Sequence, residues 1–197
     1  GKNVIGFQLG DLMISEQIIP CGHCRFCESG HYWMCQNLRM YGFQNEANGG
    51  FAQYMKIHAR GRNHPIPKEF TVEQASLIEP YACSMHAIER AGIGHADVVV
   101  ISGLGAIGLG MVAMARLALP KLIIGLDLRE NRRALAQKFG ADLVLDPSAC
   151  NVGEEIRLLT GGYGCDVYIE AAGSAASVAQ GLDAVRSLGR YVQFGVF

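Results

Sequence analysis

Four of the seven cysteines fall within one short segment, and their spacing suits a metal site. They are Cys21, Cys24, Cys27 and Cys35. Four thiolates this close along the chain can surround one Zn²⁺ tetrahedrally and leave no open coordination position. The spacing therefore predicts a structural zinc, although a redox-active cysteine cluster and an iron–sulfur site use the same residue type. We expect His23 and His31 in this segment to be bystanders, because four sulfurs already complete the shell.

A glycine-rich turn forms the second group of residues with a chemical use. Gly103, Gly105 and Gly108 follow an apolar run that ends near Ile101. In dinucleotide-binding folds the first glycine permits a tight turn, the second lets the backbone approach a pyrophosphate, and the third lets the helix pack closely. The N-terminus of that helix also faces the anion. We therefore expect a dinucleotide site here, the alternative being that the glycines serve packing alone.

An acidic residue after the next apolar run bears on which dinucleotide binds. Asp127 lies 19 residues after Gly108, where dinucleotide folds carry the carboxylate that accepts the adenosine ribose hydroxyls. A carboxylate there repels the 2′-phosphate of NADP, so we expect NAD. Three arginines could instead bind the 2′-phosphate of NADP, or could lie on the solvent-exposed face of a helix. They are Arg129, Arg132 and Arg133.

A glutamate in apolar surroundings, Glu79 before Pro80, is a weaker candidate. Taken alone, a glutamate before a proline is more often a helix-end residue than a functional one. Four histidines are also isolated along the chain, and we expect each to be structural or on the surface rather than catalytic. They are His58, His64, His86 and His95.

The elements that must position these residues alternate regularly from about residue 91 onward. Apolar runs predict strands at 98–101, 122–126, 143–145, 167–170 and 191–194. Between them we expect helices at 106–119, 129–139, 152–160 and 175–186, with Gly140 ending the second of these. Apolar strands separated by helices indicate an α/β fold with a doubly wound parallel sheet, a Rossmann domain over residues 91–197.

Residues 1–90 have a different pattern and indicate an irregular lobe that favours β-structure. Strands are expected at 12–19 and 51–57, before and after the cysteine segment. Thr71 and Gln74 have the spacing of a capping box, so a short helix should begin there and end near residue 78. Pro80 then suits the first turn of a following helix over residues 82–90.

The composition excludes several classes of protein. The 197 residues carry 17 Lys and Arg against 18 Asp and Glu, and this balance argues against a nucleic-acid or anionic-membrane partner. Residues 98–115 are uncharged and nearly long enough to span a membrane, but their four glycines predict a strand, a turn and a buried helix. The odd number of cysteines is a poor disulfide framework, so we expect a reducing compartment, the cytoplasm.

Taken together, these motifs resemble the zinc-dependent medium-chain alcohol dehydrogenases. The resemblance rests on the four-cysteine spacing, residues 49–54, the Glu79-Pro80 pair and the glycine turn with Asp127, and it covers essentially the whole chain. The Glu-Pro pair is most similar to the sorbitol (polyol) and threonine dehydrogenase branches. The resemblance implies a partly present GroES-like catalytic lobe with a structural zinc loop, joined to the Rossmann domain, and assembly as a homodimer or homotetramer.

The resemblance also implies roles for single residues. Asp127 and Arg132 would meet the adenosine ribose, and Ile107 would touch the cofactor near its phosphates. Gly195 and Val196 would lie beside the nicotinamide. The implied activity is NAD-linked oxidation of a secondary alcohol or polyol such as sorbitol, threitol or erythritol, with threonine as the next substrate candidate.

The catalytic metal is where the sequence departs from the family pattern. Glu79 would lie at or beside a catalytic zinc, but the family's catalytic Cys and its Gly-His-Glu precede the segment that residues 1–4 resemble. Family members also continue beyond the position of Phe197. We therefore expect an internal portion of a longer enzyme, inactive by itself. The alternatives are a zinc-stabilised dinucleotide-binding module without catalysis and a zinc-independent quinone or enoyl reductase, and the cysteine loop with Glu79 argues against the second.

Overall fold

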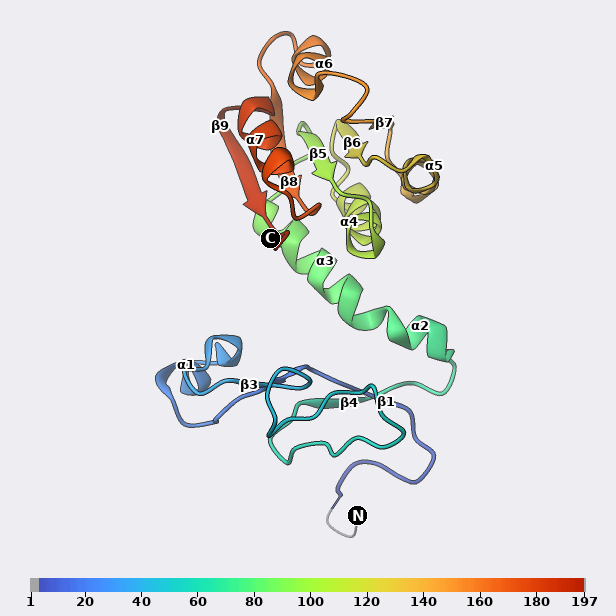
Figure 1. Cartoon of the computed structure of the whole chain (residues 1–197), viewed down its shortest axis with the longest axis vertical. Helices are drawn as coiled ribbons and strands as arrows, with labels where there is room; N and C mark the ends of the chain where they lie inside the picture. The colour runs from blue at the N-terminus through green and yellow to red at the C-terminus, as the bar shows by residue number, and fades with distance from the viewer. Residues whose placement is uncertain (1–3, 197) are drawn as a thin grey trace. The chain divides into compact units, whose positions relative to one another are not determined.

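The computed structural model describes residues 4–196 and divides into two compact units, with the boundary between Ser76 and Leu77 (Figure 1). Residues 1–3, which belong to the segment used in the family resemblance, lie outside the described residues, as does residue 197. The sequence pattern changes only at residue 91. The boundary comes earlier because α3 (Ile78–Ala91) packs against α4 (Ala106–Leu117) and β9 (Val185–Gln193).

The first unit contains the cysteine segment and two small antiparallel sheets. One sheet pairs β1 (Met13–Ser15) with β4 (Asn63–Pro65), and the other pairs β2 (Ile18–Ile19) with β3 (Arg39–Met40). Between β2 and β3 the chain forms two short helices, α1 (Arg25–Glu28) and η1 (Tyr32–Met34). The four cysteines lie in and around these two helices.

Of the two strand predictions for this unit, one is wrong in part and the other is wrong. The strand expected over 12–19 is divided into β1 and β2 by Glu16 and Gln17. Residues 51–57 do not form a strand, because Phe51 and Tyr54 project into solvent instead of packing on a neighbouring strand. The apolar residues of that segment suggested burial that this unit does not provide.

The helix α2 (Val72–Ser76) begins at the predicted capping box. The backbone N–H of Gln74 donates to Thr71 Oγ1 at 3.2 Å, and the backbone N–H of Thr71 donates to Gln74 Oε1 at 2.9 Å. These reciprocal bonds satisfy two donors that the first helical turn leaves free. The capping box is confirmed, and the helix ends slightly before the predicted residue 78.

The second unit is built on a five-stranded parallel sheet with the order β7-β6-β5-β8-β9 (Figure 1). Besides β9, its strands are β5 (Val98–Ser102), β6 (Leu122–Leu126), β7 (Leu143–Leu145) and β8 (Cys165–Glu170). The strand order reverses at β5, and open α/β sheets bind ligands at the carboxyl ends of their strands at such a switch point. The predicted doubly wound parallel sheet is confirmed.

Helices cover both faces of this sheet. On one face lie α3, α4 and α5 (Glu130–Phe139), and on the other lie α6 (Val152–Leu159) and α7 (Ala175–Ala184). Strand residues alternate between the two cores, as a pleated strand requires: Val99 and Ile101 face the first core, and Val98 and Val100 face the second.

The uncharged residues 98–115 form β5, the glycine turn and most of α4, as predicted, and most of their side chains are buried. Within the described residues, none of the helices is both long and apolar enough to span a bilayer.

The end of α7 and the start of β9 differ from the prediction. The helix ends at Ala184 rather than residue 186, and the strand begins at Val185 rather than residue 191. β9 pairs with β8 through a register irregularity, and Leu188 there has a φ of 61°. Because of this irregularity, the first residues of β9 do not show the alternation of apolar and polar residues that would predict a strand. The stop of α5 at Gly140, which has a φ of 110°, is as predicted.

Candidate cofactor and zinc sites

The glycine turn joins β5 to α4 at the switch point of the sheet. Gly103 has a φ of 95°, and a Cβ atom on it would lie 2.6 Å from the backbone nitrogen of Ala172. A Cβ on Gly108 would overlap the carbonyl oxygen of Gly103. A Cβ on Gly105 would meet nothing within 4 Å. The turn itself therefore requires glycine at 103 and 108, whereas Gly105 faces open space at the N-terminus of α4.

Asp127 follows β6 and is hydrogen-bonded to this turn. Its Oδ2 accepts the backbone N–H of Leu104 at 2.9 Å, and its Oδ1 accepts the backbone N–H of Arg129 at 2.8 Å. Arg132 Nη1 lies 3.5 Å from Oδ2 and completes an ion pair. The residue is only 8% exposed, so these bonds hold the carboxylate in one orientation.

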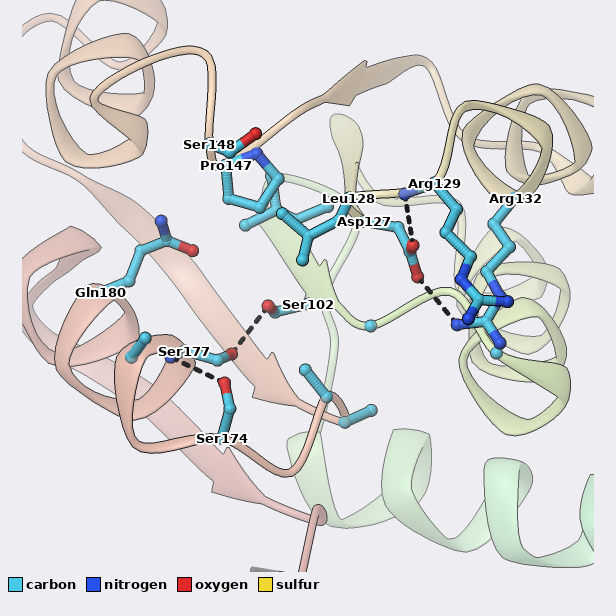
Figure 2. A pocket seen from close by; sticks show the side chains of 16 residues that line it. Ser102, Asp127, Leu128, Arg129, Arg132, Pro147, Ser148, Ser174, Ser177 and Gln180 are labelled. Carbon is cyan, nitrogen blue, oxygen red and sulfur yellow. Dashed lines mark hydrogen bonds and ion pairs between the residues drawn. The ribbon is translucent and has the colours of Figure 1, made fainter.

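The three arginines near Asp127 differ in their partners. Arg133 Nη1 donates to the carbonyl oxygens of Asp127 and Leu128 and to Asp146 Oδ2, so this side chain closes the corner between β6 and α5. Arg129 and Arg132 lie on the Asp127 side of the cavity described next (Figure 2).

The carboxyl edge of the sheet carries a cavity of about 460 Å³ (Figure 2). Gly103, Gly105 and Asp127 line the cavity on one side. Ser174, Ser177 and Gln180 face them from α7 and from the residue just before that helix. The hydroxyl oxygens of Ser102 and Ser177 are 2.7 Å apart and join the end of β5 to α7. The cavity therefore has a charged wall at the end of β6 and a hydroxyl- and amide-bearing wall at α7.

Several lining residues were not predicted from the sequence. They are Ser102, Ser148, Ser174, Ser177 and Gln180. They belong to no shared motif, because they come from three separate segments of the chain. Their one common signal is position: most of them end or follow a parallel strand, and the carboxyl ends of parallel strands meet at one edge.

Three further predicted cofactor residues lie outside the cavity lining. Ile107 packs against the core from the first turn of α4, and its carbonyl oxygen accepts the Ser84 hydroxyl at 2.9 Å. Gly195 follows β9, and its N–H donates to the Glu170 carbonyl oxygen at 2.8 Å, while Val196 beside it is exposed. Their contacts with a cofactor remain predictions.

The structure brings the four cysteine sulfurs together. All four lie within 4.8 Å of one another, and the recorded pairs are Cys21–Cys27 at 3.9 Å, Cys24–Cys27 at 3.5 Å and Cys24–Cys35 at 3.9 Å. A tetrahedron with metal–sulfur bonds of about 2.3 Å has sulfur–sulfur edges of about 3.8 Å. These three sulfur–sulfur distances are therefore close to the edges of a tetrahedral zinc site.

The surroundings of these thiols differ. Backbone N–H groups of Cys27 and Gln36 lower the pKa of the Cys24 thiol to about 6, whereas burial raises the pKa of Cys27 to about 11. The two nearby histidines have other neighbours: His23 Nδ1 lies 2.9 Å from the Cys21 carbonyl oxygen, and His31 Nδ1 lies 3.1 Å from Ser29 Oγ.

Glu79 lies in the first turn of α3, where its Oε1 accepts the Cys83 thiol at 3.3 Å. Burial and the neighbouring Glu79 carboxylate raise the pKa of Cys83 to about 11. Within residues 4–196, the four cysteines are the one group of three or more His, Cys, Asp or Glu residues placed to share a metal ion. Of the isolated histidines, His64 lies 3.3 Å from Glu16 in an exposed pair.

Two family models match the chain in succession. Residues 1–68 match the alcohol dehydrogenase GroES-like domain, and residues 106–197 match the zinc-binding dehydrogenase domain. The chain belongs to the zinc-dependent medium-chain alcohol dehydrogenase family. The first unit is therefore part of the family's GroES-like lobe, and the second is its Rossmann domain.

Curated relatives and solved structures agree with this family. The erythritol/L-threitol dehydrogenase of Mycolicibacterium smegmatis is 45% identical over 192 residues, which cover 98% of this chain and 53% of that protein. The sorbitol dehydrogenase of Halalkalibacterium halodurans and the L-threonine 3-dehydrogenase of Pyrococcus furiosus are each 35% identical over 100% of this chain, covering 57% and 56% of their own lengths. The chain thus spans about half the length of these relatives.

Two solved structures have the same fold. The alcohol dehydrogenase of Aeropyrum pernix matches with a TM-score of 0.89 and 28% identity, covering 100% of this chain and 58% of that one. A Sinorhizobium meliloti protein described as a zinc-binding dehydrogenase and solved with NADP matches with a TM-score of 0.86 and 32% identity, covering 100% and 57%.

Proposed function

We propose that the protein is a zinc-dependent dehydrogenase that transfers a hydride from a secondary alcohol or polyol to NAD. The observation that carries this proposal is the bond between Asp127 and the glycine turn at the edge of the 460 Å³ cavity. It joins the acidic residue expected at the ribose to the backbone expected at the pyrophosphate.

The chain's own residues would bind and orient the cofactor. Gly105 leaves open space at the N-terminus of α4, where a pyrophosphate can approach the free N–H groups of the first turn. Asp127 would accept the adenosine ribose hydroxyls, with Arg132 beside it. Ile107 would pack near the phosphates, and Gly195 and Val196 would lie by the nicotinamide ring.

The preference for NAD over NADP rests on Asp127. Its carboxylate is anchored by two backbone N–H groups, so it cannot easily turn away from a 2′-phosphate, and like charges repel. The Sinorhizobium meliloti relative was solved with NADP, so both cofactors are compared in the test below.

Two zinc ions enter the proposal with different roles. The four cysteines would hold a structural ion, which their sulfur spacing supports. Glu79 would serve a catalytic ion together with ligands that the family pattern places before residue 1. A catalytic zinc supplies a Lewis acid for the substrate oxygen, and the nicotinamide supplies the hydride acceptor.

The substrate class is proposed from the relatives. The 45% identity to an erythritol/L-threitol dehydrogenase favours a short polyol, and sorbitol follows from a relative of 35% identity. L-Threonine is the second candidate, because an L-threonine 3-dehydrogenase has the same 35% identity to this chain as the sorbitol enzyme. We also propose a cytoplasmic homodimer or homotetramer, since all seven cysteines are free thiols and the family assembles in this way.

The proposal is tested by binding and turnover in one preparation of the longer protein that supplies the remaining ligands of the catalytic zinc. NADH and NADPH are titrated by fluorescence, and NADH formation is then measured with L-threitol, erythritol, sorbitol and L-threonine. We expect NADH to bind more tightly and a polyol to be the fastest substrate. Binding of NADH without turnover of any alcohol, in a preparation that holds its full zinc content, would favour a dinucleotide-binding module without catalysis.

A further inference from the structure

A buried carboxylate that the proposed function does not use lies at the end of β8. The side chain of Glu170 is fully buried. Its Oε1 accepts the backbone N–H groups of Ala172 and Gly173, both at 2.9 Å, and its Oε2 accepts Gln193 Nε2 at 2.8 Å. All three of these donors are neutral N–H groups, so their dipoles compensate for the removal of the carboxylate from water.

Glu170 thereby connects segments that follow two different strands. The turn after β8 is held through Ala172 and Gly173. The segment after β9 is held through Gln193, whose Nε2 also donates to the Gly195 carbonyl oxygen at 2.8 Å. The main chain repeats this connection, because the N–H of Gly195 donates to the Glu170 carbonyl oxygen at 2.8 Å.

The connected segments are too close for side chains between them. A Cβ on Gly195 would overlap Glu170 Oε2 and lie 2.5 Å from the Gly173 nitrogen. A Cβ on Gly103 would lie 2.6 Å from the Ala172 nitrogen. The turn after β8 therefore lies against the glycine turn on one side and against Gly195 on the other. The Glu170 carboxylate holds the turn after β8 and Gly195 in place.

We infer that Glu170 is a positioning residue, which sets the backbone of Gly195 and Val196 for the nicotinamide half of the cofactor. The inference rests on the proposed function, which assigns these two residues to the nicotinamide. Asp127 and the glycine turn serve the adenosine and phosphate half. The two halves of the site thus depend on two different carboxylates, one at the end of β6 and one at the end of β8.

Glu170→Gln tests the inference with little change in shape. One carboxylate oxygen becomes an NH₂ group, which must face a donor on either side: the N–H groups of Ala172 and Gly173, or Nε2 of Gln193. ADP-ribose contains the adenosine, both phosphates and both riboses but lacks the nicotinamide. We expect NADH affinity to fall roughly tenfold and ADP-ribose affinity to change less than twofold.

A second variant tests the same connection between Glu170 and Gly195 by replacing Gln193. Gln193→Met removes the bond to Gly195 while the bonds of Glu170 to the β8 turn remain, so it should cause the same selective loss of NADH affinity. Glu89→Gln makes the equivalent charge change on an exposed residue of α3, and should leave both affinities unchanged. Thermal unfolding without ligand is measured for each variant, and if Glu170→Gln does not fold, the Gln193→Met result decides.

The outcomes separate the inference from the proposed function. Equal losses for NADH and ADP-ribose, or no loss for either, would overturn the positioning role of Glu170. Failure of the unsubstituted protein to bind either ligand would instead refute the proposed dinucleotide site, and with it the wider function.

Discussion

The backbone N–H of Leu104 donates to the Asp127 carboxylate at 2.9 Å, although the two residues are 23 positions apart in the chain. The bond joins the glycine turn to the end of the neighbouring strand. Asp127 is therefore both the charge expected at the ribose and a support for the turn beside it.

Asp127→Ala should lower NADH affinity at least tenfold and narrow the preference for NADH over NADPH. The first effect follows from the lost bonds to the ribose and to Leu104, and the second from the lost repulsion of a 2′-phosphate. Fluorescence titration with both cofactors measures each effect. Asp183→Ala is the matched control, because Asp183 pairs with Arg157 at 3.3 Å and does not line the cavity. An unchanged preference in Asp127→Ala would contradict the role of the carboxylate.

Cys24→Ser should remove zinc from the first unit and unfold it. Three sulfurs remain, but a closed four-sulfur site depends on all four ligands, and structural zinc binding is coupled to folding. Elemental analysis after dialysis measures the metal, and dinucleotide affinity should change less than twofold because the second unit has its own core. Cys150→Ser is the control: Cys150 lies in the second unit, so this variant should keep the zinc bound by the four cysteines of the first unit. Full metal content in Cys24→Ser would disprove the four-cysteine site.

Leu119→Gly should stabilise the second unit by about 0.5–1 kcal/mol. Leu119 follows the end of α4 with a φ of 52°, a left-handed conformation that a residue with a Cβ adopts at a cost, and its side chain is 70% exposed. Chemical denaturation measures the change. Met85→Gly is the control: Met85 is also exposed but lies in the middle of α3, so glycine there should destabilise by about 1 kcal/mol. Destabilisation in both variants would contradict the prediction.

Asp166 should make the second unit sensitive to acid. Burial raises the pKa of this carboxyl, but the Val98 N–H at 2.7 Å and Arg186 at 2.6 Å outweigh burial, so the pKa in the folded protein is lowered. A lowered pKa adds stability above the unfolded value of about 3.9, and that stability is lost as the pH falls through the folded value.

Asp166→Asn should therefore be less stable than the unsubstituted protein at pH 7, and the difference should shrink as the pH falls below about 4. Denaturation midpoints between pH 3 and pH 7 measure this trend. Asp183→Asn removes an exposed ion pair with Arg157 at 3.3 Å and should have little effect at pH 7. A difference that stays constant over the whole range would show that the charge of Asp166 is not the cause.

The parts of the fold that the sequence predicts are those encoded locally. The capping box of Thr71 and Gln74, the stop at Gly140 and the alternation of apolar strands with helices each depend on neighbouring residues. The strand at 51–57 failed because β-structure depends on a partner strand, which no local pattern reveals. The start of β9 failed because the irregular pairing near Leu188 interrupts the strand period.

In the cofactor and zinc sites, too, the sequence predicts the local motifs but not the contacts between distant segments. The cysteine spacing and the glycine turn are short motifs whose chemistry follows from their residue types. Glu170 was not predicted because in the sequence it is only the last residue of an apolar strand, and its partner Gln193 lies 23 residues further along the chain. The same applies to Ser102 and Ser177, whose hydroxyls are 2.7 Å apart but which are 75 residues apart in the chain.

The open space beside Gly105 gives the protein an unusual point of intervention. Its φ of −70° suits any residue, and a methyl group there would meet no protein atom within 4 Å. Gly105→Ala would thus occupy the volume expected for the pyrophosphate while leaving the architecture intact, which neither Gly103 nor Gly108 permits. A variant that folds but does not bind the dinucleotide would separate cellular functions that need the bound coenzyme from those that need only the folded protein.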